Sequence, residues 1–195
     1  MKSTEILLKL KGIFEPFIKV QNEDLLSLTQ AGEILTFEKN TILKKHNCKE
    51  EFLRFILDGI GCYLVNHKNT PTCIYFEFEN GFFVDYTSFA FEKPSDLILK
   101  TMTKATMFVI SKKAYSEICQ SNINIFKIEH IGLELLHQDT FKKYIELLTL
   151  DATERYKILI KTRQDIMQHI DHKYIASYLG ITPQSLSRLR KNLKL

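Results

Sequence analysis

The first thirty residues space their apolar side chains with the period of an α-helix. Between residues 2 and 17 these side chains recur at steps of three and four, as on one face of a helix. They are Ile6, Leu7, Leu10, Ile13, Phe14 and Phe17. Asn22 is then a suitable cap for a shorter helix that contains Leu25, Leu26 and Leu28. The pattern predicts two N-terminal helices.

The pattern changes between residues 33 and 112, where β-branched and aromatic residues form short clusters. One of these clusters is Phe82-Phe83-Val84. Turn-forming residues separate the clusters at 38–40, 57–59, 66–71, 79–81 and 92–95. Short clusters with turns at this spacing are typical of an antiparallel sandwich or barrel. This segment is therefore predicted to be a β domain.

Helical spacing returns after Ser111. Tyr115, Ile118 and Cys119 predict a short helix, and residues 122–149 predict a long one. At 1.5 Å per residue the long helix spans about 40 Å. A β domain of this size covers only part of it, so pairing with a second copy is favoured over a purely intramolecular role. Asp151 and Glu154 have the spacing of a capping box and mark a new helix.

The last 25 residues have the pattern of two short helices joined by a tight turn. Asp171 can cap the first helix, and Gly180 allows a sharp end. Thr182 and Pro183 suit the cap and first position of the second helix. The side chains expected to face inward are Ile175, Ala176, Leu179, Ile181, Leu186, Leu189 and Leu193. Together these features predict a helix-turn-helix.

The outer face of the second helix carries the side chains that suit DNA. Gln184, Ser185 and Arg188 are predicted to contact base edges, because Arg pairs with guanine and Gln with adenine in the major groove. A second set flanks this face and is predicted to contact phosphates. These residues are His172, Lys173, Thr182, Ser187, Arg190 and Lys191. The alternative is a helical hairpin that only packs against its own core.

The distribution of charge also points to the C-terminal segment as the part of the chain that contacts DNA. The chain has 27 basic and 23 acidic side chains and a net charge of +4. Residues 171–195 contain five cations and one acidic residue, Asp171, so this segment alone accounts for the net charge. Such asymmetry is typical of a protein that binds a polyanion, although a solvated basic helix end has the same composition.

The composition of the chain and the motifs it lacks narrow the class of protein. With 45% hydrophobic residues, 7 Gly and 4 Pro, the chain is not collagen-like or disordered. No apolar run exceeds four residues, so no membrane segment or signal peptide is expected and a cytoplasmic location is predicted. The cysteines Cys48, Cys62, Cys73 and Cys119 lack metal-site spacing and are predicted to be buried thiols. Neither a His-x-His pair nor a catalytic motif is present, so an enzyme, a metal and a cofactor are not expected.

The order of these elements resembles the Crp/Fnr family of bacterial transcription regulators. Residues 174–191 carry the most specific similarity, to the family's DNA-reading segment. The resemblance implies an α+β fold with a cyclic-nucleotide-binding-like β-roll (a double-stranded β-helix; 1–120), a dimerisation helix (121–150) and a helix-turn-helix domain (151–195). It further implies a homodimer, formed through 122–149, on palindromic double-stranded DNA. RNA polymerase and an unknown small-molecule effector are candidate partners.

Two departures from the family pattern qualify these implications. Members that bind cyclic nucleotides have a Gly-Glu pair and an Arg in the phosphate cassette, where this chain has Asp85-Tyr86 and a position near Asp96. Because a carboxylate repels phosphate, the cassette is predicted to be degenerate and not to bind cyclic AMP or cyclic GMP. The family's β-hairpin wing is also expected to be missing after the second helix, so DNA affinity should depend more on dimerisation.

Two other functions stay open on sequence grounds. One is an effector-sensing β-roll that docks on a protein partner through its C-terminal helices, and the other is a scaffold dimer without an effector. Tyr63, Tyr75, Phe76 and Tyr86 suit either a ligand pocket or a core.

Overall fold

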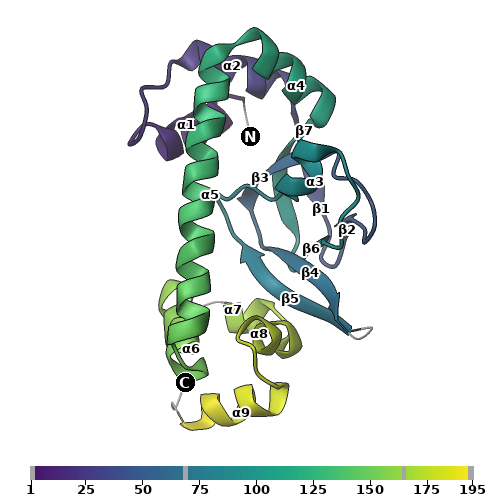
Figure 1. Cartoon of the computed structure of the whole chain (residues 1–195), viewed down its shortest axis with the longest axis vertical. Coiled ribbons are helices and arrows are strands. Elements are labelled where there is room, and N and C mark those ends of the chain that lie inside the picture. The colour runs from purple at the N-terminus through teal and green to yellow at the C-terminus, as the bar shows by residue number, and fades with distance from the viewer. Residues whose placement is uncertain (1–2, 68–69, 164–165, 193–195) are drawn as a thin grey trace.

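The computed structural model describes residues 3–67, 70–163 and 166–192 and combines a β-roll with helices at both ends (Figure 1). The helices are α1 (Ser3–Phe14), α2 (Asn22–Ala31), α3 (Tyr86–Phe91), α4 (Lys112–Ser121), α5 (Ile123–Thr149), α6 (Ala152–Thr162), α7 (Ile166–His169), α8 (His172–Tyr178) and α9 (Pro183–Asn192). The strands are β1 (Glu33–Phe37), β2 (Ile42–Lys44), β3 (Phe52–Asp58), β4 (Gly61–His67), β5 (Thr70–Glu77), β6 (Ile98–Thr101) and β7 (Ala105–Ser111). No helix within these described ranges is long and apolar enough to cross a bilayer.

The strands form two antiparallel sheets, as the sequence predicted. One sheet has the order β1-β7-β3 and the other the order β2-β6-β4-β5. Phe55 of β3 lies opposite Phe108 of β7. One buried cluster draws on residues from both sheets, because alternate side chains of each strand point inward. Its buried members are Ile56, Phe83, Leu99, Ala105, Met107 and Val109.

The N-terminal helices begin close to where the pattern placed them. α1, α2, α4 and the first part of α5 share a second core with the three-stranded sheet. Helix α2 starts at Asn22, so the predicted cap is wrong by one residue and Gln21 holds the cap position. The backbone N–H of Gln21 donates to the Asp24 carboxylate at 3.3 Å, which completes a capping box without Asn22.

Two further predictions for the β region are wrong. Residues 82–84 form no strand; only an isolated bridge joins Phe82 to Phe55, and the chain then enters α3. Cys48 is exposed and Cys119 partly exposed, so only Cys62 and Cys73 are buried thiols. Cys48 lies between β2 and β3, outside both sheets, where its side chain has no core to enter.

The C-terminal helices pack onto the four-stranded sheet rather than standing apart from it. Residues of α6, α7, α8 and α9 form one continuous core with residues of β4 and β5 and their neighbours. The buried β-roll members are Ile60, Cys62, Leu64, Cys73, Phe76 and Met102, and the buried C-terminal members are Tyr156, Leu159, Ile166, Ile170, Tyr174, Ile175, Ala176, Leu179 and Leu186. The position of α9 is therefore tied to the β-roll.

Candidate nucleic-acid interface

Helices α8 and α9 meet at a tight corner. Gly180 has a φ of +68°, a backbone conformation that favours glycine, and its N–H donates to the Ser177 carbonyl at 2.9 Å. The next N–H, of Ile181, donates to Ala176 at 2.9 Å. The four side chains that close this corner are fully buried, as predicted: Ile175, Ala176, Leu179 and Leu186. Leu189 packs partly buried against them, and Leu193 lies outside the described residues.

The start of α9 is capped by the residue that the sequence indicated. Thr182 Oγ1 accepts a hydrogen bond from the backbone N–H of Ser185 at 3.1 Å. The two hydroxyl groups also lie 3.0 Å apart. Asp171 precedes α8 in the cap position, but its side chain makes no capping hydrogen bond.

The outward face of α9 is polar and cationic. Gln184, Arg188 and Lys191 are exposed at steps of four and three, so they lie along one stripe of the helix. Ser185 is partly buried and its hydroxyl group lies within hydrogen-bond distance of Thr182, so it is less available for contacts outside the protein than Gln184 and Arg188 are. Residues 172–192 contain no Asp or Glu, so no carboxylate of α8 or α9 offsets these charges.

The residues predicted to contact phosphates are mostly exposed on α8 and α9. Arg190 Nη1 and His172 Nε2 lie 2.9 Å apart and join the end of α9 to the start of α8. Lys173 is exposed, and its ammonium group lies 4.9 Å from the centre of the Tyr174 ring. Thr182 and Ser187 are exposed as well. The structure thus places His172 and Arg190 as a pair that links α8 to α9 and leaves Lys173, Thr182, Ser187 and Lys191 exposed.

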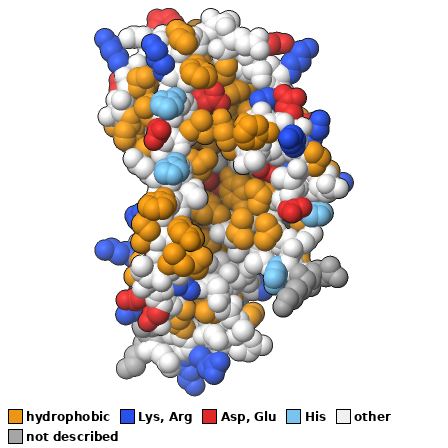
Figure 2. Space-filling model, in the orientation of Figure 1, with side chains coloured by type: hydrophobic (Ala, Val, Ile, Leu, Met, Phe, Trp, Pro, Cys, Tyr) orange, Lys and Arg blue, Asp and Glu red, His pale blue; other side chains and the backbone are white. Residues whose placement is uncertain are grey.

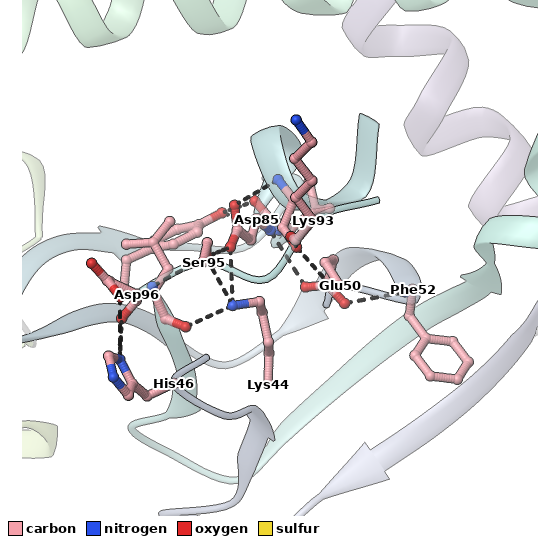
Figure 3. A network of polar contacts seen from close by, with 12 residues as sticks. Lys44, His46, Glu50, Phe52, Asp85, Lys93, Ser95 and Asp96 are labelled. Carbon is pink, nitrogen blue, oxygen red and sulfur yellow. Dashed lines mark hydrogen bonds and ion pairs between the residues drawn. The ribbon is translucent and has the colours of Figure 1, made fainter. Parts of the chain in front are cut away.

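The region of the predicted effector cassette is filled by an ion-pair network (Figure 3). Asp85 is buried, and its Oδ2 lies 3.1 Å from Lys44 Nζ. Its Oδ1 accepts from the Ser88 N–H at 3.2 Å and caps α3, while the Ser95 hydroxyl donates to Oδ2. Lys44 also donates to Ser95 Oγ at 3.0 Å and to the Leu97 carbonyl at 2.8 Å. The buried charges of Lys44 and Asp85 therefore compensate each other inside the protein.

A second buried ion pair lies beside the first. Arg54 Nη1 contacts both carboxylate oxygens of Glu50 at 3.0 Å. The same carboxylate accepts from the Asp85 N–H at 3.4 Å, and the Ser88 hydroxyl accepts from the Glu50 N–H at 2.9 Å. The two pairs thus form one connected set around the start of α3.

The three predicted cassette residues do not converge. Tyr86 donates its hydroxyl to Glu129 of α5 at 3.2 Å. Asp96 is exposed and lies 3.7 Å from His46. Of the three residues only Asp85 is fully buried, and the cation of Lys44 pairs with its carboxylate, so repulsion of a phosphate by Asp85 is offset. The sequence analysis missed Lys44, which is a buried lysine at the end of a short strand.

The aromatic residues that suggested a pocket are mostly engaged within the protein. The Tyr63 hydroxyl lies 3.2 Å from the Phe82 carbonyl and accepts from the Val84 N–H at 3.1 Å. Phe76 is buried in the core shared with the C-terminal helices. The Tyr75 hydroxyl donates to Asp139 of α5 at 2.5 Å.

An acidic group lies close to this contact between β5 and α5. Burial raises the pKa of Glu77 to about 8, and the nearby charge of Asp139 adds to the effect. Burial and the hydrogen bond to Asp139 also raise the pKa of Tyr75 well above its usual range. The pKa values of Glu77 and Tyr75 are thus both raised at this junction, beside the carboxylate of Asp139.

Comparison with solved structures identifies the fold. The regulator CLP of Xanthomonas campestris, described as responsive to c-di-GMP, matches with a TM-score of 0.68 at 15% identity, over 89% of this chain and 92% of that one. FixK2 of Bradyrhizobium japonicum matches at 0.67 and 11% identity, over 84% of each chain. A cyclic nucleotide-binding domain of Methylobacillus flagellatus matches at 0.64 and 14% identity, over 73% and 82%. No protein-family model and no curated protein sequence matches the chain.

Solved structures with this fold are Crp/Fnr-family regulators and cyclic-nucleotide-binding domains. At these identities the similarity establishes the fold alone.

Proposed function

We propose that this protein is a sequence-specific DNA-binding transcription regulator that acts as a homodimer. The observation that carries the proposal is the exposed stripe of Gln184, Arg188 and Lys191 on α9, supported from behind by the buried corner with α8. A reading helix needs a rigid base and exposed side chains that can pair with base edges. The shared fold with regulators such as CLP and FixK2 is consistent with this role.

The dimer is proposed to form along α5. Large apolar side chains are exposed on this helix, and Phe141, Ile145 and Leu148 recur at steps of four and three on one face. The others are Ile123, Phe126, Leu136, Tyr144 and Leu147. Figure 2 shows hydrophobic side chains gathered along the middle of the molecule on one face. An apolar face of this length is stabilised by a partner helix.

The β-roll is proposed not to bind cyclic AMP or cyclic GMP in the manner of the cyclic-nucleotide-binding members. Lys44, Asp85 and Ser95 already satisfy one another inside the predicted cassette. A cyclic phosphate would have to displace a buried ion pair, and the nearby arginine, Arg54, is already paired with Glu50. An unidentified effector and a contact with RNA polymerase remain compatible with this proposal.

Selection from random duplex DNA tests the function. The purified full chain is incubated with the library at about 50 mM and about 200 mM salt, and the bound DNA is sequenced. An enriched palindrome whose binding weakens steeply with salt is expected, because each neutralised phosphate releases counterions.

The matched control is a chain with Gln184→Ala and Arg188→Ala. It keeps the buried corner and the phosphate-contacting residues, so it should retain salt-dependent binding but lose the enriched sequence. Enrichment of the same palindrome by this control, or no palindrome with the unaltered chain, would contradict the proposal.

A further inference from the structure

We infer that Arg155 and Ser177 are positioning residues that fix α9 relative to α5 and the β-roll and so set the half-site spacing that the dimer accepts. This inference rests on the proposed function. It concerns neither base recognition nor phosphate contacts, since both residues lie behind the reading face.

Arg155 joins the carboxyl ends of two helices. Its Nη1 donates to the carbonyl of Leu150, which ends α5, and lies 3.5 Å from the carbonyl of Leu147. Its Nη2 donates to the carbonyl of Leu179, which ends α8, at 2.8 Å. Helix carboxyl ends carry unpaired carbonyls and a partial negative charge, so a guanidinium ion is well suited to both.

The orientation of Arg155 is set by these two contacts. Its Nε is buried and has no hydrogen-bond partner among the residues that the structure describes. An unpartnered buried donor is costly, so the side chain would turn if nothing opposed it. The rigid fork of the guanidinium can reach both helix ends at once, whereas the single ammonium group of lysine reaches one.

Ser177 provides the second attachment, between α8 and strand β5. Its hydroxyl accepts from the Cys73 N–H at 2.8 Å and donates to the Cys73 carbonyl at 3.2 Å. The two residues are 104 positions apart in the chain. One hydroxyl therefore satisfies both backbone groups of a residue at a sheet edge, next to the ring contact between Phe76 and Tyr178.

The two attachments act on the element that supports the reading helix. α8 has seven residues and α9 has ten. Attached to α5 by Arg155 and to β5 by Ser177, α8 cannot slide or rotate independently. In a dimer paired along α5, this fixes the separation of the two copies of α9. Adding one base pair between half-sites turns one of them by roughly 35° about the DNA axis. The joint, meaning the attachments of α8 through Arg155 and Ser177, is rigid, so α9 cannot follow this rotation.

The test measures affinity for the selected palindrome with the half-sites moved apart by zero, one or two base pairs. The unaltered dimer is expected to lose about tenfold or more in affinity for each added base pair, equivalent to about 1.4 kcal/mol. Arg155→Lys and Ser177→Ala are expected to reduce this loss to about threefold or less. Ser177→Thr keeps the hydroxyl and should restore the steep dependence. Each variant should prefer the same bases within a half-site.

A second measurement, made without DNA, reports how often the joint between α8 and its neighbours opens. In a chain with Cys48→Ser and Cys119→Ser, the remaining thiols are buried, and Cys73 lies in the core shared with α8. Arg155→Lys and Ser177→Ala should increase the rate of thiol labelling by a maleimide severalfold, because the joint opens more often.

An unchanged dependence of affinity on half-site spacing in both variants would overturn the inference. A variant that loses its base preference together with its spacing preference would also overturn it, because that result would indicate a general loss of structure. If the unaltered chain selects no palindrome, the proposed function fails and the spacing role with it. The labelling rates then still show whether the joint exists.

Discussion

Lys44 Nζ and Asp85 Oδ2 lie 3.1 Å apart, and each side chain is only 1% exposed. The lysine comes from the end of β2 and the aspartate from the cap of α3, so the ion pair joins two segments of the β-roll that are 41 positions apart. The Ser95 hydroxyl and the Leu97 carbonyl complete the coordination of the ammonium group. The pair lies in the region that was predicted to form the effector cassette, and its two charges compensate each other there.

Removing one member of this pair should be costly. Lys44→Met leaves Asp85 buried without its cation, and the free energy of unfolding is expected to fall by about 3–5 kcal/mol. Urea denaturation followed by circular dichroism measures the change. The control is the double variant Lys44→Met with Asp85→Asn, which removes both charges and should be more stable than the single variant. A single variant as stable as the unaltered chain would contradict a structural role for the pair.

Cyclic nucleotides should not bind at this place. Calorimetric titration of the full chain with cyclic AMP and cyclic GMP is expected to give no heat of binding at micromolar concentrations, because the cassette interior is occupied and offers no free arginine. Arg54 is already paired with Glu50 at 3.0 Å. Micromolar affinity for either nucleotide, lost in Lys44→Met, would show that the network opens to admit a phosphate.

Base contacts and phosphate contacts on α9 should respond differently to substitution. Arg188→Ala is expected to cost about 1–3 kcal/mol on the preferred palindrome and to relax specificity at one base position. Lys191→Ala should weaken preferred and random DNA alike and reduce the salt dependence of binding by about one phosphate contact. Fluorescence anisotropy with both DNAs at several salt concentrations distinguishes the two. Equal effects of both substitutions on both DNAs would mean that these roles are wrongly assigned.

Charge on the exposed face of α5 should separate the dimer. Phe141 is 55% and Leu148 66% exposed, so Phe141→Glu with Leu148→Glu should convert the dimer to a monomer without unfolding the chain. Sedimentation velocity measures the species present. Phe91→Glu is the matched control, because Phe91 is also exposed but lies at the end of α3. A dimer that survives the α5 substitutions would place the interface elsewhere.

The free energy of unfolding should decrease as the pH rises, because of Glu77. Its pKa is raised to about 8 by burial, whereas an unfolded glutamate titrates near 4.3. Between these values the folded chain holds a proton that the unfolded chain has released, so the free energy of unfolding decreases as pH rises from about 4.3 to 8. Glu77→Gln should flatten this decrease. Urea midpoints at pH 5, 6.5 and 8 measure it, and parallel slopes for the two proteins would assign the pH dependence to other groups.

Several of the predicted features of the fold that were confirmed are coded by neighbouring residues. The capping box of Asp151 and Glu154, the turn at Gly180 and the cap at Thr182 depend on contacts within a few positions. The period of apolar residues likewise predicted α5, because a helix repeats every 3.6 residues whatever surrounds it. Stripes such as Gln184 and Arg188 follow from the same period.

Predictions from the local sequence pattern were wrong where the environment of a segment decides its conformation. Residues 82–84 have the composition of a strand, yet the chain bends there toward the cap of α3. Cys48 has the hydrophobicity of a core residue but lies outside both sheets. Composition alone does not indicate whether a partner strand or a core is within reach.

The sequence by itself determined the order of the N-terminal helices, the β domain, the long helix and the C-terminal helices, together with the length of α5 and the cationic face of α9. These features depend on periodicity, caps and charge along one stretch of chain, whereas the short helices α3 and α7 were not predicted. Only the tertiary structure decided that Lys44 reaches Asp85, that Ser177 contacts Cys73 and that Arg155 joins two helix ends. These contacts link distant segments, and their partners are chosen by how the sheets and helices pack. The ion pairs of the β-roll and the position of α9 are therefore properties of the folded chain.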